Sequence, residues 1–258
     1  MNRLRLAAAV NAGKFAGAAT RRIHRGGGTA LPGLVAEKVH PNLVRDLGRS
    51  LGGGRVLITG TNGKTTTARI IAGALDADSR PFLHNREGSN LMRGIASTLL
   101  GRASPAAAIP RAASTIGLFE TDEATLPRAA AALAPSVLAF TNLFRDQLDR
   151  YGEVDTVAAL WRSALQRTPA DATLVLNADD PSVAELARGW SGPIHWFGID
   201  DPSFATTAAG AFDARWCRCG GDYVYERWYF AHVGWWRCSG CDRRRNEPAT
   251  SASAIELA

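Results

Sequence analysis

Apolar runs and stretches of helical character alternate along the middle of this chain. The apolar runs predict strands at RVLITG, STIGLFE, SVLAFTN, ATLVLNADD and PIHWFG, with a further short strand before His84. The helical stretches predict helices over 64–75, 123–133, 154–165 and 181–187. Continuous apolar strands separated by helices are typical of a parallel sheet covered on both faces. We therefore expect an α/β fold with a mostly parallel sheet and helices on both of its faces.

The first 23 residues predict an amphipathic helix. Five apolar positions can share one broad face of it: Leu4, Ala8, Phe15, Ala19 and Ile23. No acidic residue precedes Glu37, so this segment is purely cationic. We interpret the helix first as one packed on the protein's own body, and second as one in contact with an anionic membrane surface.

Signals for export or membrane insertion are weak in this sequence. Lys14 interrupts the early apolar stretch, and no small-residue cleavage site follows an adequate apolar core. No run reaches the length of a membrane-spanning helix. We therefore expect a cytoplasmic protein.

The parts outside the alternating region differ in character. RGGGTALPG (25–33) predicts a flexible turn, and a short helical piece follows around 41–51. After Asp200 the alternation stops, and a Ser/Thr/Ala/Gly linker leads to a segment with all four cysteines. The last residues, 243–258, are polar and without clear pattern. These changes predict four regions: a helical segment (1–50), the alternating domain (51–210), a cysteine module (211–247) and a further segment (248–258).

Composition limits the classes of protein that this chain can belong to. A length of 258 residues fits one large domain, or one domain with a small module. The apolar fraction of 46% and the charged fraction of 21% are those of an ordinary globular protein. The net charge is +6, but the acidic residues are spread through the chain beyond Glu37. Charge therefore does not indicate a nucleic-acid-binding protein.

A glycine-rich loop, ITGTNGKTTTARI, follows the first predicted strand and opens a helix. In that context Gly60 and Gly63 let backbone N–H groups approach a phosphate group. Lys64 can neutralise the outer phosphates, and the Thr65 hydroxyl can ligate Mg²⁺. The spacing differs from the common Walker loop, because Ile58 stands where that loop has its first glycine. The sequence still predicts a nucleoside triphosphate site at this loop.

GTNGKTTT resembles the ATP loop of the Mur ligase family, whose members join amines to carboxylates through acyl phosphates. Three further segments agree in order: ETDE (120–123), TNLFRDQLDRYGE (141–153) and LNADDP (176–181). Together with GGGTALPG, HNREGSNLMRGIAS and the cysteine window, they resemble the MurT branch, the ligase subunit of lipid II isoglutaminyl synthase. The resemblance extends from about Gly13 to the end. Members continue into a further C-terminal domain, so 248–258 is expected to be the start of a truncated continuation.

The resemblance implies a set of site residues. Lys64 and Glu120 would be catalytic, and Thr65 and Glu120 would hold Mg²⁺. Ten residues would contact ATP: Gly60, Thr61, Asn62, Gly63, Lys64, Thr65, Thr66, Asn142, Asn177 and Asp180. For Glu120 the alternative is a helix-terminal acid beside Asp122 and Glu123. For Asp179 and Asp180 the alternative is helix capping.

Other positions are less specific. Asn85, Arg86 and Asn90 could face the active cleft, whereas Asp146 and Asp149 favour helix-start or ion-pair roles. His195 could lie near the base, but one histidine on a strand is more often a packed core residue.

Two departures from the family concern metal ligation. Gln147 stands where many members have a histidine ligand, which puts a second metal in doubt. Many members also use a carbamylated lysine, but no lysine follows Lys64 and Arg162 lies near the expected place.

The resemblance implies a complete reaction. ATP would phosphorylate the α-carboxyl of the D-glutamate residue in the lipid II stem peptide, and ammonia would replace the phosphate to give D-isoglutamine. The ammonia would come from a GatD-type glutamine amidotransferase, because no nucleophilic Cys–His pair stands in this chain. The alternatives are an ATP-binding, partner-docking module without turnover and a related folate or amino-acid polyglutamylating ligase. A nucleic-acid-binding finger is a weaker one.

All four cysteines lie within 25 residues. Cys238 and Cys241 form a Cys-x-x-Cys knuckle, and Cys217 and Cys219 form a shorter Cys-x-Cys pair. Cytoplasmic thiols stay reduced, so four thiolates in two pairs favour a structural Zn²⁺ site in a zinc-ribbon-like module. The short Cys217–Cys219 spacing makes that pair the doubtful one. The alternative is a metal-free aromatic hairpin. We expect six aromatic residues of this segment to form the core of the small module or a docking face, and not to stack on bases: Tyr223, Tyr225, Trp228, Tyr229, Trp235 and Trp236.

Overall fold

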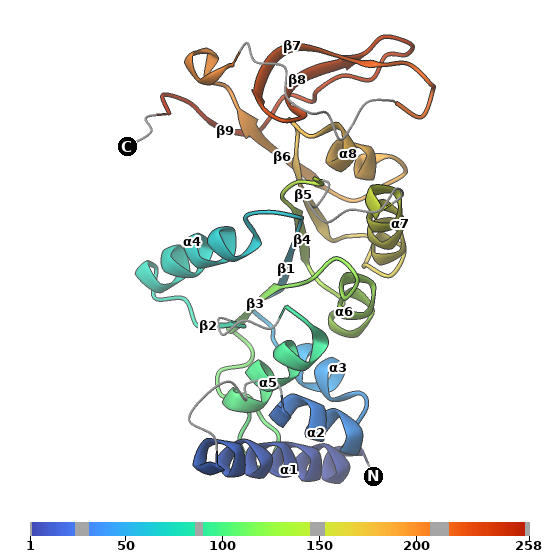
Figure 1. Ribbon diagram of the computed structural model, residues 1–258. Helices are drawn as coiled ribbons and strands as arrows, with labels where there is room; N and C mark the ends of the chain where they lie inside the picture. The colour runs from blue at the N-terminus through green and yellow to red at the C-terminus, as the bar shows by residue number, and fades with distance from the viewer. Residues whose placement is uncertain (1, 24–30, 86–89, 145–152, 207–216, 256–258) are drawn as a thin grey trace. The chain divides into compact units, whose positions relative to one another are not determined.

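The structure is a computed structural model that describes residues 2–23, 31–85, 90–144, 153–206 and 217–255 (Figure 1). The chain divides into two compact units. The first comprises Met1–Thr59, Gly63–Leu138 and Leu160–Pro169, and the second comprises Gly60–Asn62, Ala139–Ala159 and Ala170–Ala258. The main sheet has seven strands and is mostly parallel, which confirms the predicted fold class. The predicted regions 1–50, 51–210, 211–247 and 248–258 stay predictions.

Three parallel strands form the sheet of the first unit. They are β1 (Arg55–Thr59), β2 (Phe82–His84) and β3 (Ile116–Glu120), in the order β2-β3-β1. Helix α4 (Lys64–Ala77) packs on these strands, and Figure 1 shows it on one side of them and α6 (Leu126–Leu133) on the other. Apolar residues of the strands are fully buried between the helices, which is why their runs are continuous: Leu57, Ile58, Leu118 and Phe119.

Two helices of this unit were not predicted. Helix α2 (Leu31–Val39) begins inside the segment that the sequence predicts as a flexible turn, and α5 (Met92–Arg102) follows β2. Gly33 explains the first miss, because a side chain there would lie 2.3 Å from the Arg93 carbonyl oxygen of α5. Gly33 therefore permits α2 and α5 to pack closely, and it does not break helix α2. The predicted piece at 41–51 is confirmed as α3 (Leu43–Gly48), and α6 begins at Leu126, three residues after the predicted start.

The N-terminal helix is confirmed as α1 (Asn2–Ile23), but the packed side is opposite to the predicted apolar face. Figure 1 shows α1 lying across α2 and α5. Its buried positions are small residues and one valine: Ala9, Val10, Gly13 and Gly17. A side chain at Gly13 would lie within 2.9 Å of both the Pro32 carbonyl oxygen and Leu100. Close approach of the helices therefore buries the small-residue side and leaves Leu4, Ala8 and Phe15 exposed. Among the helices that the structure describes, none is long and apolar enough to cross a membrane.

Strand β4 (Val137–Phe140) begins in the first unit and ends in the second, and α7 (Glu153–Leu165) likewise has residues in both. In the second unit, β5 (Thr173–Asn177) pairs with β6 (Ile194–Ile199), and α8 (Pro181–Ala184) lies between them in the chain. The predicted strands and helix at these positions are confirmed.

The prediction that the strand at 193–198 is the last of the sheet is wrong. Strand β9 (Thr250–Ala252) pairs in parallel with β6, opposite Phe197 and Ile199. Its three residues are all exposed, so no apolar run marks them in the sequence. The expectation that His195 is a core residue is also wrong, because its ring is exposed and its Nε2 lies 2.9 Å from the Thr250 Oγ1.

The cysteine segment contains an antiparallel hairpin of β7 (Tyr223–Phe230) and β8 (Val233–Cys238). Two of its aromatic side chains are buried against the ends of β5 and β6. Trp236 donates its Nε1–H to the Ala178 carbonyl oxygen at 3.0 Å, and Tyr229 donates its hydroxyl to the Ile199 carbonyl oxygen at 2.8 Å. These aromatics are core residues, as one of the two sequence interpretations expected.

Arg245 joins the segments that follow β5 and end β6, next to this hairpin. Its Nε lies 2.6 Å from a carboxylate oxygen of Asp179, and its Nη2 bonds both Asp200 and the Ile199 carbonyl oxygen. Asp179 is almost fully buried, so burial raises the pKa of its carboxyl, against the opposing effect of Arg245. This pair explains Asp179 as a structural residue beside the helix cap of Asp180.

Replacing Arg245 with methionine is expected to lower the free energy of unfolding by about 3–5 kcal/mol at neutral pH, because the Asp179 carboxylate then stays buried without its cation. The loss should shrink in acid. Burial raises the pKa of Asp179 in the folded state, and loss of Arg245 should raise this pKa further. At a pH above the folded-state pKa, the ionised carboxylate therefore opposes folding. This penalty disappears as the pH falls towards the pKa of Asp179 in the unfolded chain. Urea unfolding at pH 8 and pH 5 measures this. Arg244→Met, at the exposed neighbouring position, is the control, and an equal loss in both variants would contradict the assignment.

Candidate functional site

The glycine-rich loop connects β1 to α4. Gly63 has a left-handed backbone (φ +79°) and caps α4, which begins at Lys64. Gly60 also has positive φ, and a side chain there would lie 1.9 Å from the Thr141 Oγ1. Both glycines are therefore required by the backbone path. The N–H groups at the start of α4 lack partners within the helix, and such a helix end stabilises bound phosphate.

On the first unit, the start of α4 brings two predicted site residues, Lys64 and Thr65, to the end of β3. The Thr65 hydroxyl lies 2.9 and 3.0 Å from the two carboxylate oxygens of Glu120. The Lys64 ammonium donates to Glu123 at 2.8 Å, and both side chains are largely buried. The structure thus brings together Thr65 and Glu120, the two predicted magnesium ligands, and that ligand role stays a prediction. The sequence analysis names Glu123 only as an acid near Glu120. In ETDE, Glu123 stands three residues after Glu120, and this spacing is the feature of the sequence that could have indicated a role for Glu123.

Asn85 holds Glu120 from the neighbouring strand. Its Nδ2 donates to the Glu120 carbonyl oxygen at 2.8 Å, and its Oδ1 accepts the Glu120 N–H at 2.9 Å. This two-point bond uses the side chain of a buried asparagine to fix the backbone from which the Glu120 carboxylate projects. Asn85 is therefore a positioning residue in this structure.

The Thr65 hydroxyl and the Glu120 carboxylate fit a magnesium ion. Mg²⁺ prefers hard oxygen ligands and is commonly held by one or two protein oxygens together with substrate phosphates and water. Both groups stand at the loop–helix junction where phosphate is expected. They form one face of such a site, which the phosphates of a nucleotide would complete.

Replacing Glu120 with glutamine is expected to raise the Mg²⁺ concentration needed for half-maximal ATP turnover by at least about tenfold, since losing a direct ligand should cost no less than losing an outer-shell partner. The amide keeps the shape and the Thr65 contact but removes the charge. Magnesium titrations of turnover measure it, with Glu226→Gln as the control because Glu226 is an exposed carboxylate on β7. An unchanged magnesium dependence would contradict the ligand role.

On the second unit, the loop residues Thr61 and Asn62 are held by the residues after β4. The Asn142 side chain accepts the Asn62 N–H at 2.9 Å and donates to its carbonyl oxygen at 3.1 Å. The Thr141 hydroxyl donates to the same carbonyl oxygen at 2.9 Å. Thr61 donates its N–H to the Asn142 carbonyl oxygen at 3.0 Å. These bonds fix the loop, so Asn142 acts first on the loop backbone. Thr141 was not singled out, although it precedes Asn142 at a strand end.

The LNADDP segment follows β5. Asn177 donates to the Thr141 carbonyl oxygen and accepts the Asp179 N–H, so its amide is already engaged on both sides. Asp180 caps α8 by accepting the N–H groups of Ser182 and Val183, and it also accepts the Leu143 N–H at 2.8 Å. The helix-capping interpretation of Asp180 is confirmed. Contacts of Asn177 and Asp180 with a nucleotide stay predictions.

Several predicted positions lie outside the described residues: Arg86, Asp146, Gln147 and Asp149. The exposed Thr66 lies in the first turn of α4, and its predicted ATP contact stays a prediction. For Asn90, the structure gives a backbone role, because its carbonyl oxygen accepts the Asp122 N–H at 2.9 Å.

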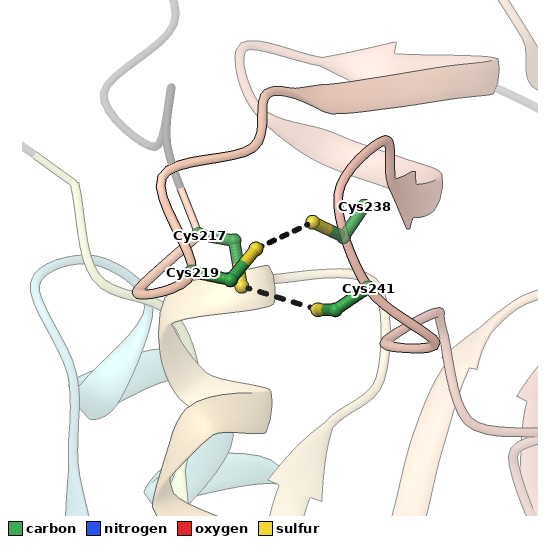
Figure 2. Close-up of side chains that lie close together, drawn as sticks. All are labelled: Cys217, Cys219, Cys238 and Cys241. Carbon is green, nitrogen blue, oxygen red and sulfur yellow. Dashed lines mark hydrogen bonds between the residues drawn. The ribbon is translucent and has the colours of Figure 1, made fainter.

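The four cysteine sulfurs converge at one point (Figure 2). All four Sγ atoms lie within 4.8 Å of one another, with 3.8 Å between Cys217 and Cys241 and 3.4 Å between Cys219 and Cys238. A disulfide would require about 2.05 Å. Four sulfurs at about 2.3 Å from a tetrahedral Zn²⁺ would be about 3.8 Å apart, so the cluster fits zinc. Cys217 and Cys219 both point into it, which removes the geometric doubt about their short spacing.

The loops around the sulfurs favour the thiolate at two of the four positions, Cys217 and Cys238, where hydrogen bonds lower the pKa. At Cys219 and Cys241, against the effect of backbone N–H groups, the bonds to the other cysteines raise the pKa. The N–H groups of Gly221 and Gly240 donate to Cys219 and Cys238, as the glycines after a metal-binding cysteine can. Burial raises the pKa of Cys217, but bonds from the Cys219 backbone and the Arg243 guanidinium outweigh it and lower the pKa to about 6. Arg243, which the sequence gave no reason to single out, also pairs with Glu185 at 2.6 Å.

The loop, the acid at the end of β3 and the asparagine after β4 all lie within the part of the chain that matches one family model. The family model described as the Mur ligase middle domain matches residues 58–215. This chain belongs to the Mur ligase family.

Relatives agree with this membership. The chain is 32% identical over 97% of its length to the lipid II isoglutaminyl synthase (glutamine-hydrolyzing) subunit MurT of Staphylococcus aureus strain COL, covering 54% of that protein. It is 34% identical to the subunit of the same name from Streptococcus pneumoniae over 85% of its length, covering 47% of that protein. The chain thus spans about half the length of the curated relatives it matches.

Solved structures share the fold of this family member. A pseudomurein peptide ligase type C from Methanothermus fervidus superposes on 82% of this chain and 40% of its own, with a TM-score of 0.61 and 22% identity. The MurF ligase from Thermotoga maritima in complex with ADP superposes on 64% of this chain and 37% of its own, with a TM-score of 0.52 and 18% identity. At these identities the likeness concerns the fold.

Proposed function

We propose that this chain is the ATP-dependent part of an amide ligase subunit that activates a carboxylate as an acyl phosphate. The observation that carries the proposal is the pairing of the Thr65 hydroxyl with the Glu120 carboxylate at the first turn of the loop helix, next to Lys64. Family membership through residues 58–215 supports the same chemistry.

The roles of the residues follow from their positions. The N–H groups at the start of α4 bind phosphate oxygens, whereas the N–H groups of Thr61 and Asn62 are already bonded to Asn142. Lys64 neutralises the transferred phosphoryl group. Because Lys64 pairs with Glu123, phosphate has to compete with that carboxylate for the ammonium group. Mg²⁺, when bound, withdraws charge from the phosphate oxygens. Glu120 and Thr65 would hold this ion, and Asn85 keeps Glu120 in place.

The reaction then has two steps. An oxygen of the acceptor carboxylate attacks the γ-phosphorus of ATP, and ADP leaves. Ammonia attacks the acyl carbon, the carbon–oxygen bond to phosphate breaks, and the ammonia nitrogen loses its extra proton to solvent. Oxide is a very poor leaving group and phosphate is a good one, so the first step makes the second possible. Catalysis rests on positioning and on charge stabilisation.

The acceptor that fits best is the lipid II stem peptide, at the α-carboxyl of its D-glutamate residue. Support comes from the relatives in Staphylococcus aureus and Streptococcus pneumoniae, which are named as lipid II isoglutaminyl synthase subunits. Their names include glutamine hydrolysis, and all four cysteines of this chain lie in one cluster. We therefore propose a separate GatD-type glutamine amidotransferase as the source of ammonia, and a cytoplasmic location, where thiols stay reduced.

We also propose that the cysteine cluster binds zinc as a structural ion. The four thiols would hold Zn²⁺ and clip the start of β7 to the end of β8. Trp236 and Gly234 of β8 bond the backbone of Ala178 and Asp179, so the clip would also steady the LNADDP segment.

Amidation of a lipid II-type acceptor tests the function. The chain would be supplied with ATP, Mg²⁺, the acceptor and either ammonium or the amidotransferase with glutamine, and the amide detected by mass spectrometry. ATP-dependent product is expected. Product from a folate or amino-acid acceptor but not from this one would favour a polyglutamylating ligase. ATP binding without any product would favour a docking module.

A further inference from the structure

The side of α1 that faces away from α2 and α5 is apolar at its centre and basic along its edges. Leu4 is 80% exposed and Phe15 is 78% exposed, the two most exposed of the large apolar side chains that the structure describes. With 3.6 residues per turn, Leu4, Ala8 and Phe15 lie in one row along the helix. Large apolar groups so exposed on one helix row indicate a surface that binds something.

The other side of α1 cannot supply that partner, since it is already packed. Gly13 and Gly17 are buried there. Asn11 lies in the same row as Leu4 and Phe15, and its side chain donates to the carbonyl oxygens of Ala7 at 2.8 Å and Pro105 at 3.0 Å. Arg5 donates to the Val39 carbonyl oxygen at 2.8 Å. The helix is therefore fixed to its unit, and the orientation of the Leu4–Phe15 row is set by packing.

Charge distinguishes among possible partners. Arg3 and Lys14 flank the apolar row on one side and Arg5 flanks it on the other. No Asp or Glu stands among the first 36 residues. A second copy of the same face would bring like charges together. An anionic lipid surface would receive the apolar row between its acyl chains and the basic edges among its phosphates.

We propose that this face of α1 docks on the surface of an anionic phospholipid bilayer. Leu4 and Phe15 enter the boundary between headgroups and acyl chains, and Arg3 and Lys14 contact headgroup phosphates. The helix lies in the plane of the interface. Docking does not depend on the proposed function, although it would keep the chain beside a lipid-linked acceptor.

Vesicle sedimentation tests the proposal with the 258-residue chain. The chain should pellet with vesicles of phosphatidylglycerol and phosphatidylcholine, and much less with phosphatidylcholine alone or at high salt. Leu4→Gln with Phe15→Gln should weaken the partition coefficient by about tenfold. Arg3→Glu with Lys14→Glu should weaken it by at least about 25-fold, at about fivefold for each charge lost.

Matched controls separate docking from general charge and fold. Ile70→Gln removes another exposed apolar side chain, and Arg80→Glu with Arg167→Glu makes the same change in net charge elsewhere on the first unit. These variants should bind vesicles like the parent chain. Equal losses in controls and test variants, or no vesicle binding by the parent chain, would overturn the proposal. So would concentration-dependent self-association in ultracentrifugation that only the Leu4/Phe15 variant abolishes, because the face would then belong to a second copy.

Discussion

Replacing Lys64 with alanine is expected to lower ATP turnover by about 100-fold or more, because no other cation among the described residues at the start of α4 could neutralise the transferred phosphoryl group. The ammonium lies at the first residue of the helix and pairs with Glu123 at 2.8 Å. The effect should fall mainly on kcat, since the charge being neutralised develops during transfer. Steady-state phosphate release measures it.

Lys38→Ala is the matched control, one of only two other lysines in the chain and exposed on α2. It should leave turnover unchanged. Lys64→Arg should recover little, because a planar guanidinium does not fit a position built for a point charge. Turnover in Lys64→Ala within a few-fold of the parent chain would contradict the assignment of the loop.

Replacing Cys241 with serine is expected to remove zinc and to lower the free energy of unfolding by at least about 3 kcal/mol, since structural Zn²⁺ binds with about 10–16 kcal/mol in small zinc modules. Cys241 is exposed, so the substitution changes little packing. Because β8 bonds the backbone of the LNADDP segment, ADP affinity should fall as well. Metal analysis, urea unfolding and calorimetric titration with ADP measure the three effects.

Ser239 lies between Cys238 and Cys241, and Ser239→Ala is the control. It should keep one zinc per chain and the parent stability. Parent protein purified without chelator that carries no zinc would contradict the structural-ion account, as would a Cys241→Ser variant with unchanged stability.

Long apolar runs made most of the fold predictable. Strands buried on both faces keep continuous apolar residues, so β1, β3, β4 and β5 could be located within a few residues. Strand β9 could not, because three exposed residues at the edge of a sheet carry no pattern. Helix α2 could not be predicted for another reason. Its glycine and proline are typical of a turn, but Gly33 is needed because α5 passes close to it.

The N-terminal helix shows where periodicity is insufficient. The sequence correctly predicts that Leu4, Ala8 and Phe15 share a face, but not which face is buried. Close packing through Gly13 and Gly17 favours the small-residue side, and glycines carry almost no signal in a hydrophobic pattern.

The candidate site was predictable where chemistry and position coincide. Lys64 and Thr65 open a helix and Glu120 ends a strand, and the structure brings Thr65 and Glu120 into contact. Partners that act through side-chain bonds to backbone, such as Asn85 and Thr141, could not be assigned in advance. Their partners lie 35 and 79 residues away in the chain, and only the folded sheet joins them.

The fate of the acceptor oxygen tests the central claim most directly. A lipid II-type acceptor whose glutamyl α-carboxylate carries a heavy oxygen isotope would be amidated with ATP, Mg²⁺ and ammonium, and the released phosphate analysed by mass spectrometry. The acyl-phosphate account predicts one heavy oxygen atom transferred to phosphate for each amide formed. Amide formation with unlabelled phosphate would contradict it.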